Sequence, residues 1–499
     1  DNGAGGLSSS VGEMATLCGG ACIDLAEAPL KYAGLDPWEV LLSEAQERMT
    51  LAVPAEQLEG FLALARRREV EATDLGEFTT EPVFHVQQAG KTIAHLDMTF
   101  LHDGCPTLVL DARWQPPAAA ELADVEPGDH AEALRALLGR LNLCSNETKA
   151  RQYDHEVKGL SVVKPFVGVG ADVPGDAAVF LAGHSGRAGV VLSEGILPRY
   201  SDLDTYWMAA AAVDLAVRRA VAVGGSVGRI AALDNFCWPD PVQSERTPDG
   251  HHKLAQLVRA CRGLQDACLV FDLPLISGKD SMKNDSTRGG VKISIPPTLL
   301  VSVIGTMDDV SRAQTLDAKR PGDLLYILGE TRAELGAGEY LQYLGEQREG
   351  VGWLGDRVPT VDLELSRACC EAVGGLLDRG LVRTAHAPGP GGLALALVRT
   401  ALGGRLGVDV DLARLPAAQP LSPAEALYSE SGGRFLLSAA ADDAAEVERA
   451  MEGLPWARIG EVTAAAPAAR VCLREGERTL VDEALERLER AWKETLHGV

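Results

Sequence analysis

The sequence predicts an α/β protein in which one structural unit occurs twice. Short apolar runs alternate with amphipathic stretches along the 499 residues, as in sheets that are covered by helices. The segment DPWEVLLSEAQER (36–48) returns as SPAEALYSESGGR (422–434), with Pro, Glu, Ser, Glu and Arg at matching positions. Because the matching residues all lie 386 positions apart, we interpret them as an internal duplication.

The glycine-rich opening of the chain belongs to the same repeat. DNGAGGL (1–7) aligns with APGPGGL (387–393) at the same offset, and LGEFT (75–79) aligns with IGEVT (459–463) at an offset of 384. We therefore expect one unit, called B, at about 1–112 and a second copy within about 316–490.

Both copies are expected to contain the same elements in the same order. The glycine turn leads into a helix at 8–18. The apolar runs MTLAVP (49–54) and RFLLSAA (434–440) predict strands. Amphipathic spacing predicts helices at 54–70 and 441–454, and a polar turn at Ala89–Gly90 predicts a β-hairpin.

A different segment separates the two copies. Residues 116–143 are polar and helix-prone, and we expect a connector there. From about 160 to 315 follows an A-type α/β unit with the strand-like runs AVFLAG, GVVLS and TLLVSVIGTM and long helices near 204–223 and 250–269. The predicted domain boundaries are 1–112, 113–160, 161–315 and 316–499.

The resulting order is B–A–B. A duplicated protein would read A–B–A–B, so we expect that an N-terminal A unit is missing. The first B unit would then expose an apolar face that its A partner would cover.

Composition excludes several classes of function. The net charge is −24, and basic clusters are few and short, so we expect neither nucleic acid nor a membrane surface as a partner. No apolar run approaches the roughly 18–20 residues that cross a bilayer. The ten cysteines have no zinc-finger spacing. Irregularly spaced cysteines of this kind are typical of reduced thiols in the cytoplasm.

The two copies differ at charged positions. Asp1 becomes Ala387, and Gln46 and Glu47 become Gly432 and Gly433. The first copy therefore keeps carboxylates and an amide beside its glycine loop, and carboxylate oxygens suit Mg²⁺. The alternative is that Asp1 only caps the following helix.

The A unit adds further acidic candidates. Asp176 stands at the start of an apolar strand, and Asp234 follows the apolar residues of another. In LPLISGKDSMKND (273–285) we expect a buried strand that ends at Ile276 and a polar turn over 277–281. Such a turn can offer backbone N–H groups, a cation, a carboxylate and a hydroxyl to a phosphate–Mg²⁺ group. An ordinary surface turn is the alternative.

Together these motifs resemble phosphoribosylformylglycinamidine synthase (FGAM synthase), of the aminoimidazole-ribonucleotide-synthetase-like superfamily. They cover nearly the whole chain in the family's order: DNGAGGLSSSVGEMA, SEAQERM, LGEFT, RQYDHEV, PGDAAV, LDNFCWPDP and ISGKDSM. The resemblance implies a duplicated α/β synthetase fold, of which this chain is a B–A–B remnant, and it implies ATP and Mg²⁺ as cofactors.

The resemblance also implies roles for individual residues. Asp1 corresponds to an aspartate that binds a second Mg²⁺. ATP-binding positions correspond to Asp234 and Gly278, and substrate-binding positions correspond to Glu44, Ala45, Gln46 and Ser281. The family's catalytic histidine and first metal-binding glutamate belong to the A unit expected upstream of residue 1, so no catalytic residue is assigned here.

Some positions depart from the family pattern. Lys279 stands where shorter relatives have an Mg²⁺-binding Asn, so metal binding is expected to pass to Asp280. Relatives also hold a second, non-catalytic nucleotide, with a Glu and an Asn on one helix helping to bind metal. Here the equivalent helix reads VDLAVRRAVAVGG, with Arg218 or Arg219 and then Ala222 in place of the Glu and the Asn. Asp176 of that site is retained as a candidate metal ligand, but we do not expect the nucleotide to be fully bound.

The implied reaction belongs to purine biosynthesis. ATP phosphorylates the amide oxygen of formylglycinamide ribonucleotide to an iminophosphate, and ammonia then displaces phosphate to give formylglycinamidine ribonucleotide. A glutaminase subunit or domain supplies the ammonia from glutamine. We expect the chain alone to be inactive.

Two alternatives are a different synthetase or kinase of the superfamily and a catalytically silent scaffold. The duplication argues against the first, and the retained Asp1, Glu44 and Gln46 argue against the second.

Overall fold

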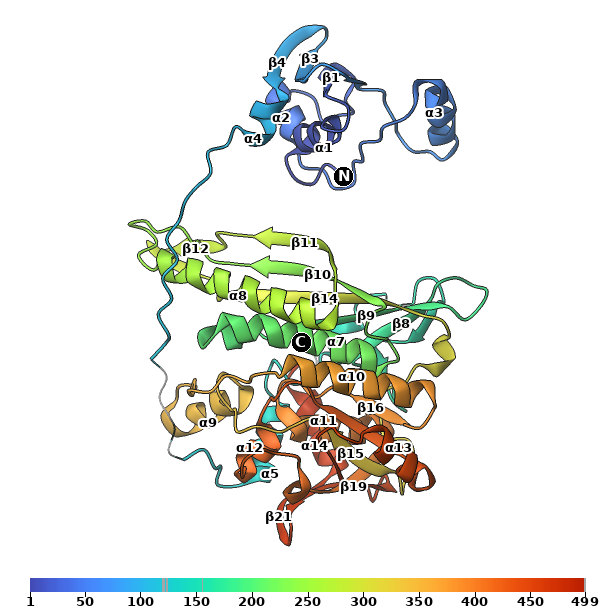
Figure 1. Cartoon of the computed structure of the whole chain (residues 1–499), viewed down its shortest axis with the longest axis vertical. Helices are drawn as coiled ribbons and strands as arrows, with labels where there is room; N and C mark the ends of the chain where they lie inside the picture. Colours follow the sequence, from blue (N-terminus) through green and yellow to red (C-terminus); the bar gives the residue numbers. More distant parts are fainter. Residues whose placement is uncertain (119–121, 123, 155, 498–499) are drawn as a thin grey trace. The chain divides into compact units, whose positions relative to one another are not determined.

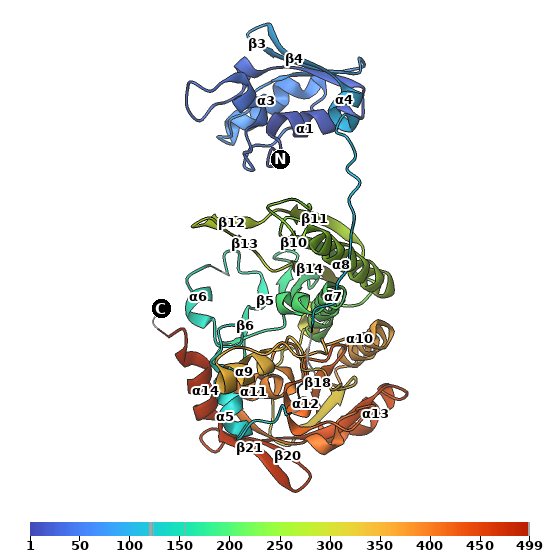
Figure 2. The same ribbon diagram turned by 90° about the vertical axis from the view of Figure 1, so that its left-hand side faces the viewer.

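The computed structural model describes residues 1–118, 122, 124–154 and 156–497. The chain divides into two compact units, residues 1–109 and 110–499, and each has its own apolar core. The first unit is drawn in blue and the second from cyan to red (Figures 1 and 2). Among the described residues, no helix has both the length and the apolar character needed to span a bilayer.

The first unit is a four-stranded sheet packed against helices. The sheet order is β2-β1-β3-β4. Leu7 and Val11 of the first helix pack with Ile23, Phe84 and Val86 of the strands in one buried cluster. The elements are α1 (Gly6–Ala15), β1 (Gly20–Asp24), α2 (Pro37–Leu42), α3 (Leu58–Arg67), β2 (Gly76–Thr79), β3 (Val83–Gln88), β4 (Lys91–Asp97) and α4 (Met98–Asp103).

The β3–β4 hairpin turns at Ala89–Gly90, as predicted. Both turn residues have positive φ, 51° and 76°, which is the geometry of the tight hairpin turn that matches strand twist. The Asp24 carboxylate accepts hydrogen bonds from both turn N–H groups, at 2.9 and 3.1 Å. The turn is thereby tied to the end of β1.

The predicted strand at 49–54 is absent from the first unit, where these residues form no strand. Its counterpart in the second copy is β18 (Phe435–Ala439), a fully buried strand between β16 (Thr384–His386) and β15 (Leu324–Leu328). The first unit has no counterparts of β15 and β16 among its described strands. Without neighbouring strands, the apolar run at 49–54 has no backbone partners with which to form the hydrogen bonds of a sheet.

The second unit contains a six-stranded sheet of order β11-β10-β14-β9-β8-β5. Two long helices cover one of its faces (Figure 1), and both lie where the sequence predicted them. The elements are β5 (Ser161–Val163), β8 (Ala177–Leu181), β9 (Gly189–Ile196), α7 (Thr205–Ala222), β10 (Ile230–Cys237), α8 (Gly250–Phe271), β11 (Leu275–Ser281) and β14 (Thr298–Met307). Small pairs flank the sheet: β6 (Phe166–Val167) with β7 (Val173–Pro174), and β12 (Asp285–Arg288) with β13 (Val291–Ser294).

A seven-stranded sheet of order β16-β18-β15-β19-β17-β20-β21 completes the second unit. The part β19-β17-β20-β21 repeats the order and strand directions of β2-β1-β3-β4, which agrees with the duplication. The further elements are α9 (Glu339–Glu349), α10 (Leu363–Asp378), α11 (Gly392–Gly404), β17 (Leu406–Asp411), α12 (Pro423–Tyr428), α13 (Ala444–Ala450), β19 (Trp456–Ala465), β20 (Arg470–Glu475), β21 (Arg478–Ala484) and α14 (Leu485–Glu494).

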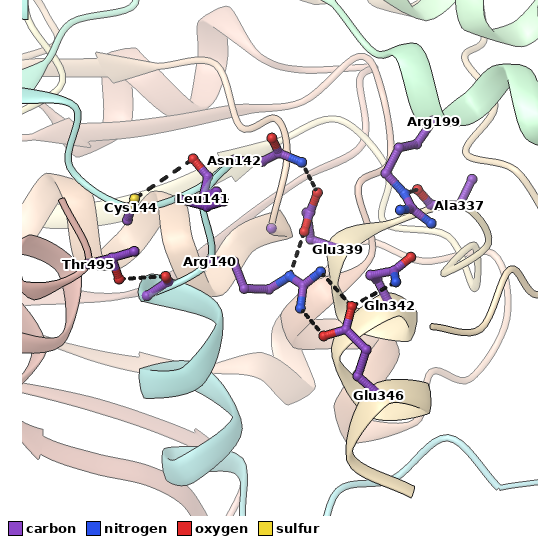
Figure 3. Close-up of polar contacts among 12 residues, drawn as sticks. Arg140, Leu141, Asn142, Cys144, Arg199, Ala337, Glu339, Gln342, Glu346 and Thr495 are labelled. Carbon is purple, nitrogen blue, oxygen red and sulfur yellow. Dashed lines mark hydrogen bonds and ion pairs between the residues drawn. The ribbon is translucent and has the colours of Figure 1, made fainter. Parts of the chain in front are cut away.

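The predicted connector is more than a polar linker. Its helix α5 (His130–Leu138) buries Ala133, Leu134 and Leu137 completely and packs beside α14 (Figure 2); the short helix α6 (Glu147–Ala150) follows. Arg140 donates to Glu339 at 2.7 Å and to Glu346 at 2.8 Å, which ties the end of α5 to α9 (Figure 3). The spacing of its leucines, at 134, 137 and 138, puts them on one face of the helix and explains why this charged segment becomes part of the core.

Candidate functional site

The glycine loop of the first unit is held against the segment that follows α2. Gly5 N–H donates to the Glu44 carboxylate at 3.1 Å, and Asn2 pairs with Ala45 as an isolated β-bridge. Gly3 N–H donates to the Asp1 carboxylate at 2.8 Å. The structure therefore brings together four of the predicted residues, Asp1, Glu44, Ala45 and Gln46, since a side chain on Gly3 would collide with both Asp1 and Gln46.

The close approach requires glycine at position 6. Gly6 has φ +60°, and a Cβ atom there would lie 2.6 Å from the Leu41 carbonyl oxygen. In the second copy, Gly392 has φ +71° and the same contact with backbone atoms of α12. Gly391 N–H likewise donates to Glu430 at 2.9 Å, as Gly5 does to Glu44. The duplication thus repeats both the backbone path and the glutamate that holds it.

The two copies differ in what they expose. Glu430 is buried, and its other carboxylate oxygen accepts from the Tyr200 hydroxyl at 2.9 Å. Burial raises the pKa of Glu430. Asp1, Glu44 and Gln46 are exposed. Asp1 caps no helix, because the N-cap of α1 is Gly5 and has no side-chain cap. The alternative of a simple capping aspartate is therefore wrong.

A second group of predicted residues lies on two neighbouring parallel strands of the six-stranded sheet. Asp234 of β10 is opposite Gly278 of β11, and Phe236 is opposite Asp280. The expected polar turn over 277–281 is wrong, because β11 runs through these residues to Ser281. Ile276 is exposed rather than buried. As the edge strand, β11 can carry polar residues that an interior strand would bury.

Asp234 lies in an open groove of about 780 Å³ between α8 and strands β10 and β11. Burial raises the pKa of Asp234, and the neighbouring Asp280 carboxylate raises it further. A Cβ atom on Gly278 would lie 2.6 Å from the Asp234 carboxylate oxygen. Because Gly278 has no side chain, the Asp234 carboxylate can occupy the space beside it.

The groove wall is largely apolar and was missed from the sequence. It includes Phe236, Leu264, Cys268 and Leu269. Burial raises the pKa of Cys268 to about 11, so its thiol stays neutral. The residues from α8 recur at three- to four-residue steps, which is the signal that would have located them.

The remaining predicted residues of β11 lie on the other face of the sheet. Successive side chains of β11 point to opposite faces, so Lys279 and Ser281 lie on the face opposite Gly278 and Asp280. Ser281 is held by Asn284, whose amide donates to its carbonyl oxygen at 2.7 Å and to its hydroxyl at 3.1 Å. Asn284 was not among the predicted residues.

The Asp234–Asp280 pair is compatible with Mg²⁺. Within the described ranges, no three His, Cys, Asp or Glu side chains form a cluster that could hold a metal. Mg²⁺ does not require one, because it commonly takes one or two carboxylates together with phosphate and water oxygens. A bound cation would lower the raised pKa of Asp234, because its positive charge would offset the repulsion between the two carboxylates.

Asp176 has a different environment. Both of its oxygens lie within 3.0 Å of the His386 Nδ1 atom, and both residues are buried. Its other charged neighbours are Arg219 and Arg399. Burial and the neighbouring Arg219 together lower the pKa of Arg399 to about 10, so its guanidinium group stays charged near neutral pH. The predicted metal role of Asp176 stays a prediction, and these cations disfavour it.

Two domain families match the chain. The family described as AIR synthase related protein, C-terminal domain, matches residues 1–88 and 320–471. The corresponding N-terminal domain matches residues 174–307. The C-terminal domain is therefore recognised in both copies of the repeat, with the N-terminal domain between them.

Curated relatives of the chain are FGAM synthase subunits. Phosphoribosylformylglycinamidine synthase subunit PurL of Thermomicrobium roseum is 34% identical over 508 residues, which cover 99% of this chain and 63% of the relative. The subunit of Deinococcus radiodurans is 32% identical over 518 residues, which cover 100% and 64%. The resemblance to FGAM synthase is confirmed, and the chain spans less than two thirds of these relatives.

Solved structures of a PurL protein share the fold. The chain resembles Thermotoga maritima PurL complexed with ADP at a TM-score of 0.59 and 21% identity, over 93% of this chain and 63% of that one. The same protein complexed with FGAR gives a TM-score of 0.54 at 18% identity, over 74% and 54%. These similarities confirm the predicted α/β synthetase fold.

Proposed function

Because this chain belongs to the AIR synthase related protein family, we propose that it provides the ATP-binding and part of the substrate-binding residues of an FGAM synthase. The reaction converts formylglycinamide ribonucleotide, ammonia and ATP to formylglycinamidine ribonucleotide, ADP and phosphate. The observation that supports this most directly is the groove in which Asp234, paired with Gly278 across the sheet, and Asp280 meet an apolar wall. The wall suits a purine base, and the carboxylates suit a phosphate-bound cation.

Mg²⁺ held by Asp234 and Asp280, or by Asp1, would neutralise charge on the transferred phosphoryl group. The chain's own residues position the reactants. Glu44 and Gln46 lie exposed beside the glycine loop, where they can accept from and donate to the substrate's polar groups. Ser281 would bind substrate through a hydroxyl that Asn284 orients. Positioning accounts for most of the rate in phosphoryl transfer, where the protein does little covalent chemistry.

Two further features belong to the proposal. Ammonia would come from a glutaminase partner, because free ammonia in water at neutral pH is mostly protonated and no longer a nucleophile. We place the protein in the cytoplasm, which agrees with all ten cysteines being free. Purine nucleotide precursors and ATP would both be available there.

Calorimetric titration of the chain with ATP and Mg²⁺ tests the nucleotide site. We expect saturable binding that weakens at least about tenfold in Asp234→Asn. The matched control is Asp249→Asn, an exposed carboxylate at the start of α8, which should bind normally. Absence of binding at millimolar ATP would favour the silent scaffold.

An activity assay of the full-length protein tests the reaction itself. The protein should form the amidine from formylglycinamide ribonucleotide in the presence of ATP and ammonium salts. ATP binding without amidine formation by pure, folded protein would keep the nucleotide site and would exclude FGAM synthase activity.

A further inference from the structure

The outer face of the first unit's sheet carries a cysteine beside a histidine. Cys22 of β1 lies between the core residues Ala21 and Ile23, and His85 of β3 lies between two core residues in the same way. Because successive side chains of a strand point to opposite faces, Cys22 and His85 both face away from the apolar core. The two residues are partners in the parallel pairing of β1 with β3, so their side chains are neighbours.

The contacts of His85 are those of a base that is held next to a nucleophile. Its Nδ1 atom lies 3.6 Å from the Cys22 sulfur, within hydrogen-bond reach of a thiol. Its Nε2 atom lies 2.9 Å from the Thr92 hydroxyl and 3.4 Å from the Gln87 amide. A hydroxyl can donate or accept, so Thr92 can hold the ring whether or not Nε2 carries a proton. A nucleophile, a base within its reach and a third group that orients the base together form an activated thiol.

The pair is open to solvent and has two further titratable neighbours. His95 of β4 is opposite His85, with the ring centroids 5.3 Å apart. Glu77 of β2 is opposite Cys22. Both neighbours are exposed, and Cys22 and His85 are partly exposed, so small molecules can reach the sulfur. Reactive cysteines typically lie in such partly exposed positions beside a histidine.

The second copy provides a comparison within the same chain. Asp409 and Cys472 occupy the corresponding positions in β17 and β20 and are likewise partners in a parallel pairing. Burial raises the pKa of Cys472, and so do the carboxylates of Asp409 and Asp482. The thiolate is the nucleophilic form, so we expect Cys472 to be inert. In the part of the chain that the structure describes, Cys22 is the only cysteine within hydrogen-bond distance of a histidine.

We propose that Cys22 is a site of reversible modification by low-molecular-weight disulfides, with His85 as its base. The Nδ1 atom of His85 takes the thiol proton, and the Cys22 sulfur attacks one sulfur of the disulfide. A new S–S bond forms as the original S–S bond breaks. Cys22 is thereby oxidised, and the second sulfur is reduced and leaves as a thiol with the proton from His85. A small thiol reverses the exchange. The site uses none of the residues of the proposed function.

Treatment of the whole chain with bis(2-hydroxyethyl) disulfide, followed by acid quenching and mass spectrometry of its peptides, tests the proposal. Cys22 should be modified about tenfold or more faster than Cys18 and Cys105, although both of these are more exposed. Cys472 should stay unmodified, and dithiothreitol should return Cys22 to the free thiol. Modification of Cys22 no faster than that of Cys18 and Cys105 would overturn the proposal.

Substitutions at the base and at the group that orients it locate the activation. His85→Gln should slow the modification of Cys22 about tenfold and leave the rates of the other thiols unchanged. Thr92→Val should also slow it, whereas Thr92→Ser keeps the hydroxyl and should react at the parent's rate. The matched control His95→Gln removes the neighbouring imidazole and should leave Cys22 as reactive as before. Each variant is first checked for an unchanged circular dichroism spectrum. A folded His85→Gln protein whose Cys22 reacts at the parent's rate would contradict the assignment of the base.

Discussion

At the scale of single residues, the Asp234–Asp280 pair sets the pH dependence of the groove. Burial and Asp280 together raise the pKa of Asp234. A carboxyl group whose pKa is raised by folding binds its proton more tightly in the native state. Its contribution to stability is therefore present at low pH and is lost as the pH rises from the unfolded value, 3.8, through the native value.

Asp280→Asn should lower the pKa of Asp234, because it removes the repulsion and leaves the burial. Carbon-detected NMR titration of the Asp234 carboxyl group measures this directly. The variant should also lose less stability than the parent as the pH rises through this window. Asp266→Asn, which changes an exposed carboxylate on the same helix that lines the groove, should leave the titration unchanged. An unshifted Asp234 in Asp280→Asn would show that burial alone sets its pKa.

Gly278→Ala tests how closely the strand and carboxylate fit. The new Cβ atom would lie 2.6 Å from the Asp234 carboxylate oxygen, so the carboxylate must turn away. We expect the affinity for ATP–Mg²⁺ to fall about tenfold or more, with little change in melting temperature, since the displaced group faces the open groove. In Gly183→Ala, nothing lies within 4 Å of the new Cβ atom, and the affinity should stay the same.

At the scale of elements, the sequence predicted those whose signal is local. The hairpin around Ala89–Gly90 and helices α7 and α8 carry their own turn residues and periodicity. The run at 49–54 has the same apolar pattern as β18, and its failure to form a strand depends on neighbours elsewhere in the chain. The edge position of β11 also depends on partners, so a polar strand was predicted as a turn.

The hairpin turn offers a stabilising substitution. Ala89 has φ 51°, a conformation that costs L-residues energy and glycine almost none. Ala89→Gly should therefore raise the stability of the first unit by roughly 0.5 kcal/mol, which is the local strain less the added entropy of the unfolded chain. Thermal unfolding measures it. Gly90→Ala, at φ 76°, is the reverse substitution and should lower stability; a gain in that variant would refute the turn geometry.

The contact between α5 and α9 depends on Arg140 (Figure 3). Glu339 is only 5% exposed and accepts from Arg140 and Asn142. Arg140→Ala would leave this buried carboxylate with the Asn142 amide and no cationic partner, so the second unit should lose about 3 kcal/mol. Urea unfolding checks this. Glu346→Gln changes only the exposed partner of Arg140 and should lower the free energy of unfolding by less than about 1 kcal/mol. Equal losses of stability in both variants would show that the contact of Arg140 with buried Glu339 contributes no more than its contact with exposed Glu346.

At the scale of the whole molecule, the first unit exposes apolar side chains that the second copy buries. Trp38, Leu42, Met49 and Leu51 are 46–62% exposed. Their counterparts in the repeat are all buried: Ala424, Tyr428, Phe435 and Leu437. The duplication made this exposed apolar surface predictable, because the corresponding positions are buried in the second copy. The resemblance placed Asp176 and Arg218 or Arg219 at one site, whereas the position of Arg399 beside them depends on the fold and had no signal in the sequence.

The separate cores of the two units predict two unfolding events. No buried residue is shared between the cluster around Leu7 and Phe84 and the large core of the second unit, so neither unit's packing requires the other's. Gly6→Ala places a Cβ atom 2.6 Å from the Leu41 carbonyl oxygen at a positive φ. It should destabilise the first unit by about 2 kcal/mol or more and lower one calorimetric transition only. Arg140→Ala should lower only the other. A single transition that both substitutions shift equally would show that the units fold as one.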